Sequence, residues 1–223
     1  MPEQLLLDLP VRPALGREDF FISGSNNLAI AALEDWRNWP FEKLVIAGPS
    51  GSGKTHLAHV WANESDAKIV PIDALEDQTP DTLACQPLVI EDLDKISESA
   101  ERVLFHIHNL MAANGHPLLI TSNAPPYELQ FALPDLGSRM QGTSVVTLDA
   151  PDDDLLAAVI VKRFSDLQLK VAPNVIPYLL HHMERSFEMA HRVIDALDNE
   201  AMKEGRAVTR ALATQVLSKI VTD

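Results

Sequence analysis

The chain has 223 residues, enough for one large domain, or for a large and a small one, with a sizeable core. Hydrophobic residues make up 46% of it and charged residues 22%, a balance that is typical of globular proteins and excludes wholesale disorder, collagen and a coiled coil. The net charge of −14 disfavours direct, non-specific binding to a DNA backbone.

The first part of the chain is predicted to alternate between strands and helices. Residues 1–16 combine prolines and leucines without a helical period and are predicted to be extended. Short apolar runs typical of buried strands follow at residues 43–47, 68–72, 88–90, 118–121 and 145–148. Helical patterns cover residues 26–36, 55–63 and 100–114, the last of which ends at Gly115, a typical C-cap. This alternation predicts an α/β fold with a parallel sheet and helices on both faces.

The second part is predicted to be entirely helical. The sequence PDDD at residues 151–154 interrupts the pattern, and Asp152 or Asp153 is a candidate N-cap for the helix that follows. Helical patterns then cover residues 153–168, 174–184, 187–203 and 209–221. The chain is therefore predicted to comprise an extended segment (1–16), an α/β nucleotide-binding domain (17–150) and a small all-α domain (151–223).

The strongest motif is the sequence GPSGSGKT at residues 48–55, which matches the phosphate-binding loop G-x-x-x-x-G-K-[ST] at each fixed position. It lies between a predicted strand and a predicted helix, where backbone N–H groups and the helix dipole attract phosphate. Lys54 is predicted to reach the β- and γ-phosphates, and Thr55 to hold Mg²⁺. The residues predicted to surround the phosphates are Gly48, Pro49, Ser50, Gly51, Ser52, Gly53, Lys54, Thr55 and His56.

Two further strand ends offer polar groups to the same site. Glu91 and Asp92 follow the predicted strand at 88–90, where a P-loop site needs an acidic residue. Glu91 is predicted to hold Mg²⁺, directly or through water, and Asp92 to orient the attacking water. The commoner order of these two acids is Asp-Glu, so the order Glu-Asp found here leaves the division of roles open. Asn123 is a candidate for a hydrogen bond to the γ-phosphate or its water. The alternative for Glu91 and Asp92 is that they are ordinary solvated acids at a strand end, and the alternative for Asn123 is that it is only a turn residue.

The sequence also bears on the cellular setting. The single cysteine, Cys85, excludes an intrachain disulfide and a cysteine-rich zinc site, and it fits a reducing cytoplasm. No run approaches about 18 apolar residues, so no transmembrane helix is predicted. The first 13 residues lack the basic start of a signal peptide. We therefore expect a cytoplasmic protein without membrane contacts.

The order of these motifs resembles that of the AAA+ ATPases, and among them the bacterial replication initiator DnaA and its relative Hda. Residues 20–26 (FFISGSN) resemble the segment that lines the adenine side in DnaA, which implies nucleotide contacts for Phe21 and Ile22. Residues 91–92 (ED) and 121–126 (TSNAPP) resemble the Walker B and sensor 1 segments. The resemblance implies an AAA+ P-loop domain followed by a helical lid, with ADP or ATP and Mg²⁺ as cofactors.

Two arginines have roles that rest on this resemblance. Residues 133–140 (LPDLGSRM) match the segment that carries the arginine finger, which implies that Arg139 completes the nucleotide site of a neighbouring subunit in trans. The alternative is a surface arginine in an intramolecular ion pair. The sensor 2 arginine of DnaA aligns with Glu188, a departure from the family pattern. Arg192, one helical turn later, is either its replacement at the nucleotide or a solvated residue, and His191 and Arg185 are weaker substitutes.

The two ends of the chain favour Hda-type proteins within this group. No residues follow position 223 to form the helix-turn-helix domain that DnaA uses to read DNA, so we expect no direct sequence-specific DNA binding. Residues 4–9 (QLLLDL) resemble the clamp-binding peptide of Hda proteins. That resemblance implies a polar anchor and apolar contacts with a pocket on the clamp, from Gln4, Leu5, Leu7 and Leu9. The alternative is a leucine-rich strand that packs on its own domain.

The resemblance thus implies a regulator of replication initiation. It would dock on the DNA-loaded sliding clamp, the β subunit of DNA polymerase, and use Arg139 to stimulate ATP hydrolysis by DnaA, with at most weak hydrolysis of its own; a homodimer is compatible with this. Two alternatives remain open. A free-standing AAA+ ATPase of the helicase-loader type would use Glu91 and Asp92 for its own turnover, and a non-catalytic adaptor would keep ADP bound. The P-loop is common to all three.

Overall fold

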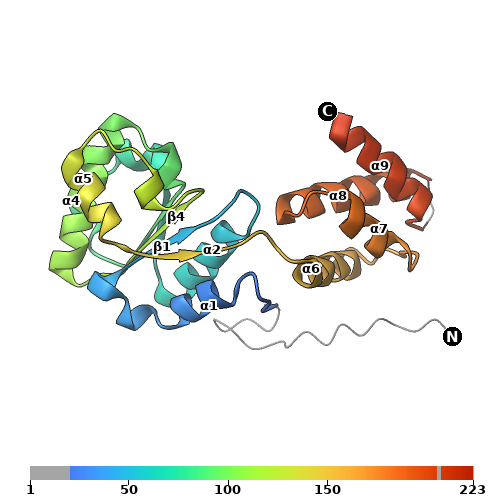
Figure 1. The fold of residues 1–223 in the computed structure, drawn as a ribbon, viewed down its shortest axis with the longest axis horizontal. Coiled ribbons are helices and arrows are strands. Elements are labelled where there is room, and N and C mark those ends of the chain that lie inside the picture. Colours follow the sequence, from blue (N-terminus) through green and yellow to red (C-terminus); the bar gives the residue numbers. More distant parts are fainter. Residues whose placement is uncertain (1–20, 205–206, 223) are drawn as a thin grey trace. The chain divides into compact units, whose positions relative to one another are not determined.

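The computed structural model describes residues 21–204 and 207–222 (Figure 1). The predicted extended segment at the N-terminus lies outside the described residues. Contacts group residues 26–149 into one compact unit, here called the P-loop unit. Residues 21–25 group with those from 150 onward into a second one, the helical unit. The domain boundaries predicted from the sequence remain a prediction, and each unit is described by itself.

The five predicted strands are present and form one parallel sheet in the order β2-β3-β4-β1-β5. Their bounds are β1 Lys43–Ala47, β2 Lys68–Pro71, β3 Leu88–Glu91, β4 Leu118–Ser122 and β5 Ser144–Thr147. The predicted parallel α/β architecture is therefore confirmed. Because β1 pairs with β4, and β4 with β3, the loops after these three strands meet at one edge of the sheet.

Helices cover both faces of the sheet, as predicted, with α1 and α2 on one face and α4 and α5 on the other (Figure 1). The helices and 3-10 turns of this unit are α1 Asn27–Glu34, η1 Trp36–Asn38, η2 Pro40–Glu42, α2 Lys54–Ser65, η3 Ile72–Asp77, α3 Pro80–Leu83, η4 Leu93–Lys95, α4 Glu98–Asn114, η5 Pro126–Glu128 and α5 Pro134–Gln141. Strand side chains alternate between the faces, so Val45, Ile90 and Ile120 join one core with Leu104 and Met111 of α4.

The ends of α4 follow its local sequence. The Ser97 hydroxyl accepts a hydrogen bond from the backbone N–H of Ala100 at 3.1 Å and so caps the first turn. Gly115 ends the helix with φ of +70°, which confirms the predicted C-cap. By contrast, α1 ends at Glu34, before the predicted limit, and a 3-10 turn takes over at Trp36.

Nothing in the local sequence predicts α5. Its eight residues include a proline and a glycine, and a helix this short is marginal by itself. Tertiary packing supplies the missing stabilisation, because Leu136 and Met140 are fully buried in the core on the α4 side of the sheet.

The helical unit contains the four predicted helices, each within about two residues of its predicted limits. They are α6 Asp153–Asp166, α7 Val175–His182, α8 Phe187–Glu204 and α9 Arg210–Thr222. Of the two candidate caps of α6, Asp152 takes the role and accepts the N–H of Leu155 at 2.8 Å. Asp153 instead pairs with Arg185 at 3.0 Å. No helix in the described part of the chain is long and apolar enough to cross a membrane.

Candidate nucleotide-binding site

The loop after β1 needs its glycines for geometric reasons. At Gly48 an added Cβ would lie 2.1 Å from the carbonyl oxygen of Leu148, so a side chain cannot be placed there without a shift of the backbone. Gly51 and Gly53 have φ of +71° and +99°, a region that other residues rarely adopt. The hydroxyl of Ser52 is buried without a hydrogen-bond partner. The loop thus has the backbone path and the unused donor that a phosphate site requires.

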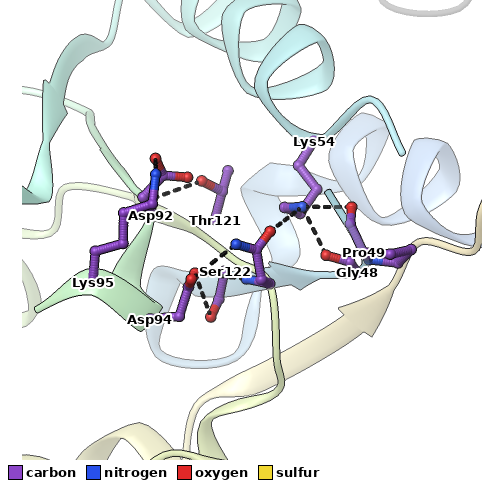
Figure 2. A network of polar contacts seen from close by, with 9 residues as sticks. Gly48, Pro49, Lys54, Asp92, Asp94, Lys95, Thr121 and Ser122 are labelled. Carbon is purple, nitrogen blue, oxygen red and sulfur yellow. Dashed lines mark hydrogen bonds and ion pairs between the residues drawn. The ribbon is translucent and has the colours of Figure 1, made fainter. Parts of the chain in front are cut away.

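Lys54 begins α2 and points back into this loop. Its Nζ donates hydrogen bonds to the carbonyl oxygens of Gly48 (2.7 Å) and Pro49 (2.8 Å) and to Oδ1 of Asn123 (2.9 Å) (Figure 2). Burial lowers the pKa of Lys54, and the charge of Asp94 opposes that shift. The ammonium group has three N–H donors, and these three hydrogen bonds use all of them. A phosphate oxygen would therefore bind Lys54 by replacing one of these acceptors.

Glu91 ends β3 with one carboxylate oxygen available for a ligand. Its Oε2 lies 3.8 Å from Nε2 of His59, whereas Oε1 is buried and has no hydrogen-bond partner. On α2, Thr55 is exposed and lies one turn before His59. A hydroxyl and a carboxylate are ligands that Mg²⁺ accepts, so these residues fit the predicted ion. Among the side chains described, no cluster of three or more His, Cys, Asp or Glu could hold a metal, so phosphate and water would complete the coordination.

Asp92 has a different setting from its neighbour. Its φ of +64° turns the chain, and its backbone N–H donates to the Thr121 hydroxyl at 3.1 Å. Its carboxylate forms an ion pair with Lys95, 2.7 Å from Oδ2 to Nζ (Figure 2). The predicted role of Asp92 in orienting water stays a prediction, and it would require this ion pair to open.

Asn123 and Asp94 form a pair that the sequence alone does not reveal. The backbone N–H and the Nδ2 group of Asn123 donate to the two carboxylate oxygens of Asp94, at 2.7 and 2.8 Å. Burial raises the pKa of Asp94, but these hydrogen bonds outweigh burial and the pKa lies below its usual value. The only local signal was a third acid after β3, and its partner is 29 residues away. Asn123 lies beside Lys54, and its predicted hydrogen bond to a γ-phosphate remains a prediction.

Arg139 lies in the last turn of α5 with an exposed side chain. Its guanidinium stacks over the ring of Phe105, 5.3 Å from the centroid, and within the described residues it has no ion-pair partner. The start of α5 is held by Glu101, which is only 3% exposed and accepts the N–H groups of Ala132 (2.9 Å) and Leu133 (2.6 Å). Glu101 is a further positioning residue, and its local sequence gives no hint of the role.

The remaining candidate residues lie in the helical unit or outside the described residues. Phe21 and Ile22 are half-buried and group with the helical unit, and Glu188 and Arg192 are exposed on α8. Their contacts to a nucleotide remain predictions, and Arg185 is already paired with Asp153. The clamp-binding candidates Gln4, Leu5, Leu7 and Leu9 lie outside the described residues. The structure thus brings together the P-loop and the polar groups that follow β3 and β4.

No family model matches the chain. Individual known proteins are nevertheless similar to it in sequence and in fold. The chain is 25% identical, over 93% of its length, to the chromosomal replication initiator protein DnaA of Thermomicrobium roseum. Domain III of the Thermotoga maritima DnaA has the same fold, with a TM-score of 0.79 and coverage of 94% of this chain and 98% of that one, at 20% identity. The chain is thus similar in sequence to DnaA and has the fold of DnaA domain III.

Two further structures share this fold. DnaA of Aquifex aeolicus with bound AMPPCP has a TM-score of 0.70 and 20% identity, with coverage of 86% of this chain and 68% of that one. A RuvB variant of Thermotoga maritima has a TM-score of 0.72 and 17% identity, with coverage of 95% and 74%. The chain spans half the length of the curated DnaA that it matches.

Proposed function

We propose that this chain is a nucleotide-bound AAA+ regulator of replication initiation that stimulates ATP hydrolysis by DnaA. It would do so by placing Arg139 against the nucleotide of a neighbouring DnaA molecule, where the guanidinium stabilises charge that develops on the γ-phosphate. The sequence similarity to DnaA supports this choice of partner.

The observation that carries the proposal is the place of Arg139 in the P-loop unit. The last turn of α5 leads into the start of β5, so Arg139 lies near the amino ends of the parallel strands, whereas the P-loop follows the carboxyl end of β1. Lys43, the first residue of β1, is close enough for Arg139 to contribute to its lowered pKa, after burial as the main cause. The five residues of β1 span about 16 Å, so Arg139 lies at the opposite end of β1 from its own phosphate site, which leaves it available to a neighbouring molecule.

The chain's own site would hold ADP or ATP. Lys54 and Ser52 would contact the phosphates, while Thr55 and Glu91 would hold Mg²⁺, which offsets phosphate charge when bound. The ion pair between Asp92 and Lys95 disfavours a water-orienting role, which supports weak hydrolysis by the chain itself. The bound nucleotide then serves mainly to order the P-loop unit.

The N-terminal segment with Gln4, Leu5, Leu7 and Leu9 would dock on the DNA-loaded sliding clamp. The net charge of −14 supports this indirect route, because an acidic chain is repelled by DNA and gains proximity to it through the clamp. In this scheme the protein is cytoplasmic and makes no direct sequence-specific DNA contacts.

The test is ATP hydrolysis by DnaA in the presence of this protein, the clamp and DNA, compared with reactions that lack one component. We expect stimulation only when all are present. The Arg139→Ala variant should lose the stimulation and still bind the clamp. Arg102→Ala removes another exposed arginine of the same unit, on α4, and should behave as the unchanged protein.

Full stimulation by the Arg139→Ala variant would refute the proposed mechanism. Rapid ATP turnover by the chain alone, lost in a Lys54→Ala variant, would instead indicate a free-standing ATPase of the helicase-loader type. Tight ADP binding without turnover, and without any effect on DnaA, would indicate a non-catalytic adaptor.

A further inference from the structure

Lys43, the first residue of β1, is a buried lysine without a partner. Its side chain is only 4% exposed, and across residues 21–204 and 207–222 no hydrogen bond or ion pair engages its Nζ atom. Lysine side chains are almost never buried unless they are paired, because burial removes water from the charge. Burial accordingly lowers the pKa of Lys43. The fold thus retains a basic group whose counter-charge the described chain does not supply.

The register of the sheet shows where this side chain lies. Strand side chains alternate between the faces, and Val45, two residues after Lys43, packs in the core on the α4 side. In the parallel register Lys43 is the partner of Leu118 of β4, which belongs to the same core. The side chain of Lys43 therefore lies on the face that α4 and α5 cover, at the amino end of β1.

Thr143 connects this position to Arg139. It directly precedes β5 and lies next to Lys43, because the residues that follow these two are partners in the parallel register. Its hydroxyl donates a hydrogen bond to the carbonyl oxygen of Arg139 at 2.9 Å and lies 3.4 Å from Nε2 of the buried His108. After burial, the charge of Arg139 is the next cause of the lowered pKa of Lys43. Two basic side chains are thus brought together by the pairing of β1 with β5.

The surroundings of these two side chains do not balance their charge. Of the described acidic groups, only Glu42 acts on the pKa of Lys43, and its effect is smaller than those of burial and Arg139. His108 stays neutral, because burial and the two cations lower its pKa to about 4, and its Nδ1 is buried without a partner. The chain has 32 acidic residues against 18 lysines and arginines, so acids are not scarce. The missing counter-charge is therefore expected on a ligand.

We propose that Lys43 and Arg139 form a two-cation binding site for a phosphate group at the amino end of β1, apart from the P-loop. A phosphate group carries about two negative charges near neutral pH and several acceptor oxygens, which match an ammonium and a guanidinium. Lys43 would contact it from the sheet, and the exposed side chain of Arg139 would cover it from the solvent side.

The phosphate group has two candidate sources with the same chemistry. One is the γ-phosphate of the nucleotide held by a neighbouring DnaA molecule, and this source rests on the function proposed above. In that case Lys43 adds a second positive charge where Arg139 stabilises the developing negative charge. The other source is free inorganic phosphate, which would compete with that nucleotide for Arg139.

Inorganic phosphate is the probe for the site itself. A phosphate titration at constant ionic strength, followed in an assigned ¹H–¹⁵N spectrum, should shift the amide signal of Thr143. The P-loop also attracts phosphate, and the signals of Gly51 and Gly53 report that binding separately. Lys43→Met keeps an apolar side chain and removes the charge. We expect it to weaken the Thr143 response about tenfold and to leave the response of the two glycines unchanged.

The DnaA assay identifies the source of the phosphate group. If the source is the nucleotide of DnaA, Lys43→Met should lower the maximal stimulated rate by about fivefold or more, and Lys43→Arg should restore it. Lys68→Met is the matched control, because Lys68 begins β2 of the same sheet with an exposed side chain, and it should leave both measurements unchanged. Weakened phosphate binding with unchanged stimulation would support the site with free phosphate as its ligand.

The stability of Lys43→Met separates binding from a structural role. Removal of an unpaired buried charge should raise the urea midpoint of the P-loop unit, whereas loss of a structural lysine would lower it. The proposal is overturned if Lys43→Met changes neither the phosphate response nor the stimulation, or if both fall together with the midpoint. Retained stimulation by Arg139→Ala would instead refute the proposed function, and the phosphate titration would still test this site.

Discussion

Removal of the Glu101 side chain should destabilise the P-loop unit substantially. In Glu101→Ala, the N–H groups of Ala132 and Leu133 lose their acceptor, and each loss costs about 1–3 kcal/mol. Ala132 is exposed and Leu133 half-buried, so water replaces part of the lost bonding and the lower end, about 2 kcal/mol for the pair, applies. The loss of a buried methylene adds about 0.8 kcal/mol. The sum is about 3 kcal/mol.

The three tryptophans give an assay that reports on this unit alone. Trp36, Trp39 and Trp61 are the tryptophans of the chain, and all three lie in the P-loop unit, where Trp39 stacks on Trp61 at 5.1 Å. Urea unfolding followed by tryptophan fluorescence therefore measures its free energy of unfolding without a signal from the helical unit. With a slope of about 2 kcal/mol per molar urea, a loss of 3 kcal/mol lowers the midpoint by about 1.5 M.

The matched control is Glu98→Ala, in the first turn of the same helix, where the side chain is exposed. It removes a favourable charge from the start of α4 and should cost less than about 1 kcal/mol. If Glu101→Ala shifts the midpoint no more than Glu98→Ala does, the two hydrogen bonds do not hold the start of α5 and the reasoning is refuted. Because α5 carries Arg139, we also expect the Glu101→Ala protein to stimulate DnaA less at temperatures where it is still folded.

Three further predictions concern single positions. Gly48→Ala should destabilise the P-loop unit by at least about 2 kcal/mol in the same urea assay, because its Cβ meets the backbone carbonyl of Leu148, the residue after β5. Gly142→Ala, where the nearest atom lies 3.6 Å from the added Cβ, should be nearly neutral in this assay. Burial, with the charges of Lys43 and Arg139, lowers the pKa of His108 to about 4, so the unfolded chain takes up a proton first as the pH falls. Stability should therefore drop by about 3 kcal/mol from pH 6.5 to pH 4, and a His108→Gln variant should lose that part of the pH dependence. Asp152→Ala should lower the free energy of unfolding of the helical unit by about 1 kcal/mol, measured by circular dichroism, and leave the unfolding transition seen by tryptophan fluorescence unchanged. Equal shifts of the two transitions would contradict the assignment of this cap to the helical unit.

The sheet could be predicted from the sequence because its signals are local. Each strand is a short apolar run, β1 is followed by a glycine and β3 ends at an acid, and the P-loop motif requires a strand before it and a helix after it. The glycines at 48, 51 and 53 are demanded by the same geometry that the motif encodes. The helix caps at Asp152 and Gly115 depend on neighbours within a few residues, which is why they could also be foreseen.

What only the tertiary structure decided is how distant polar groups combine. Glu101 meets the start of α5 across 31 residues, and Asp94 meets Asn123 across 29, through loops that no local pattern relates. Local propensity and motif spacing determine which elements form and where phosphate binds. The direction of each side chain depends on charges brought close by the parallel pairing of strands, and that information exists only once the sheet has formed.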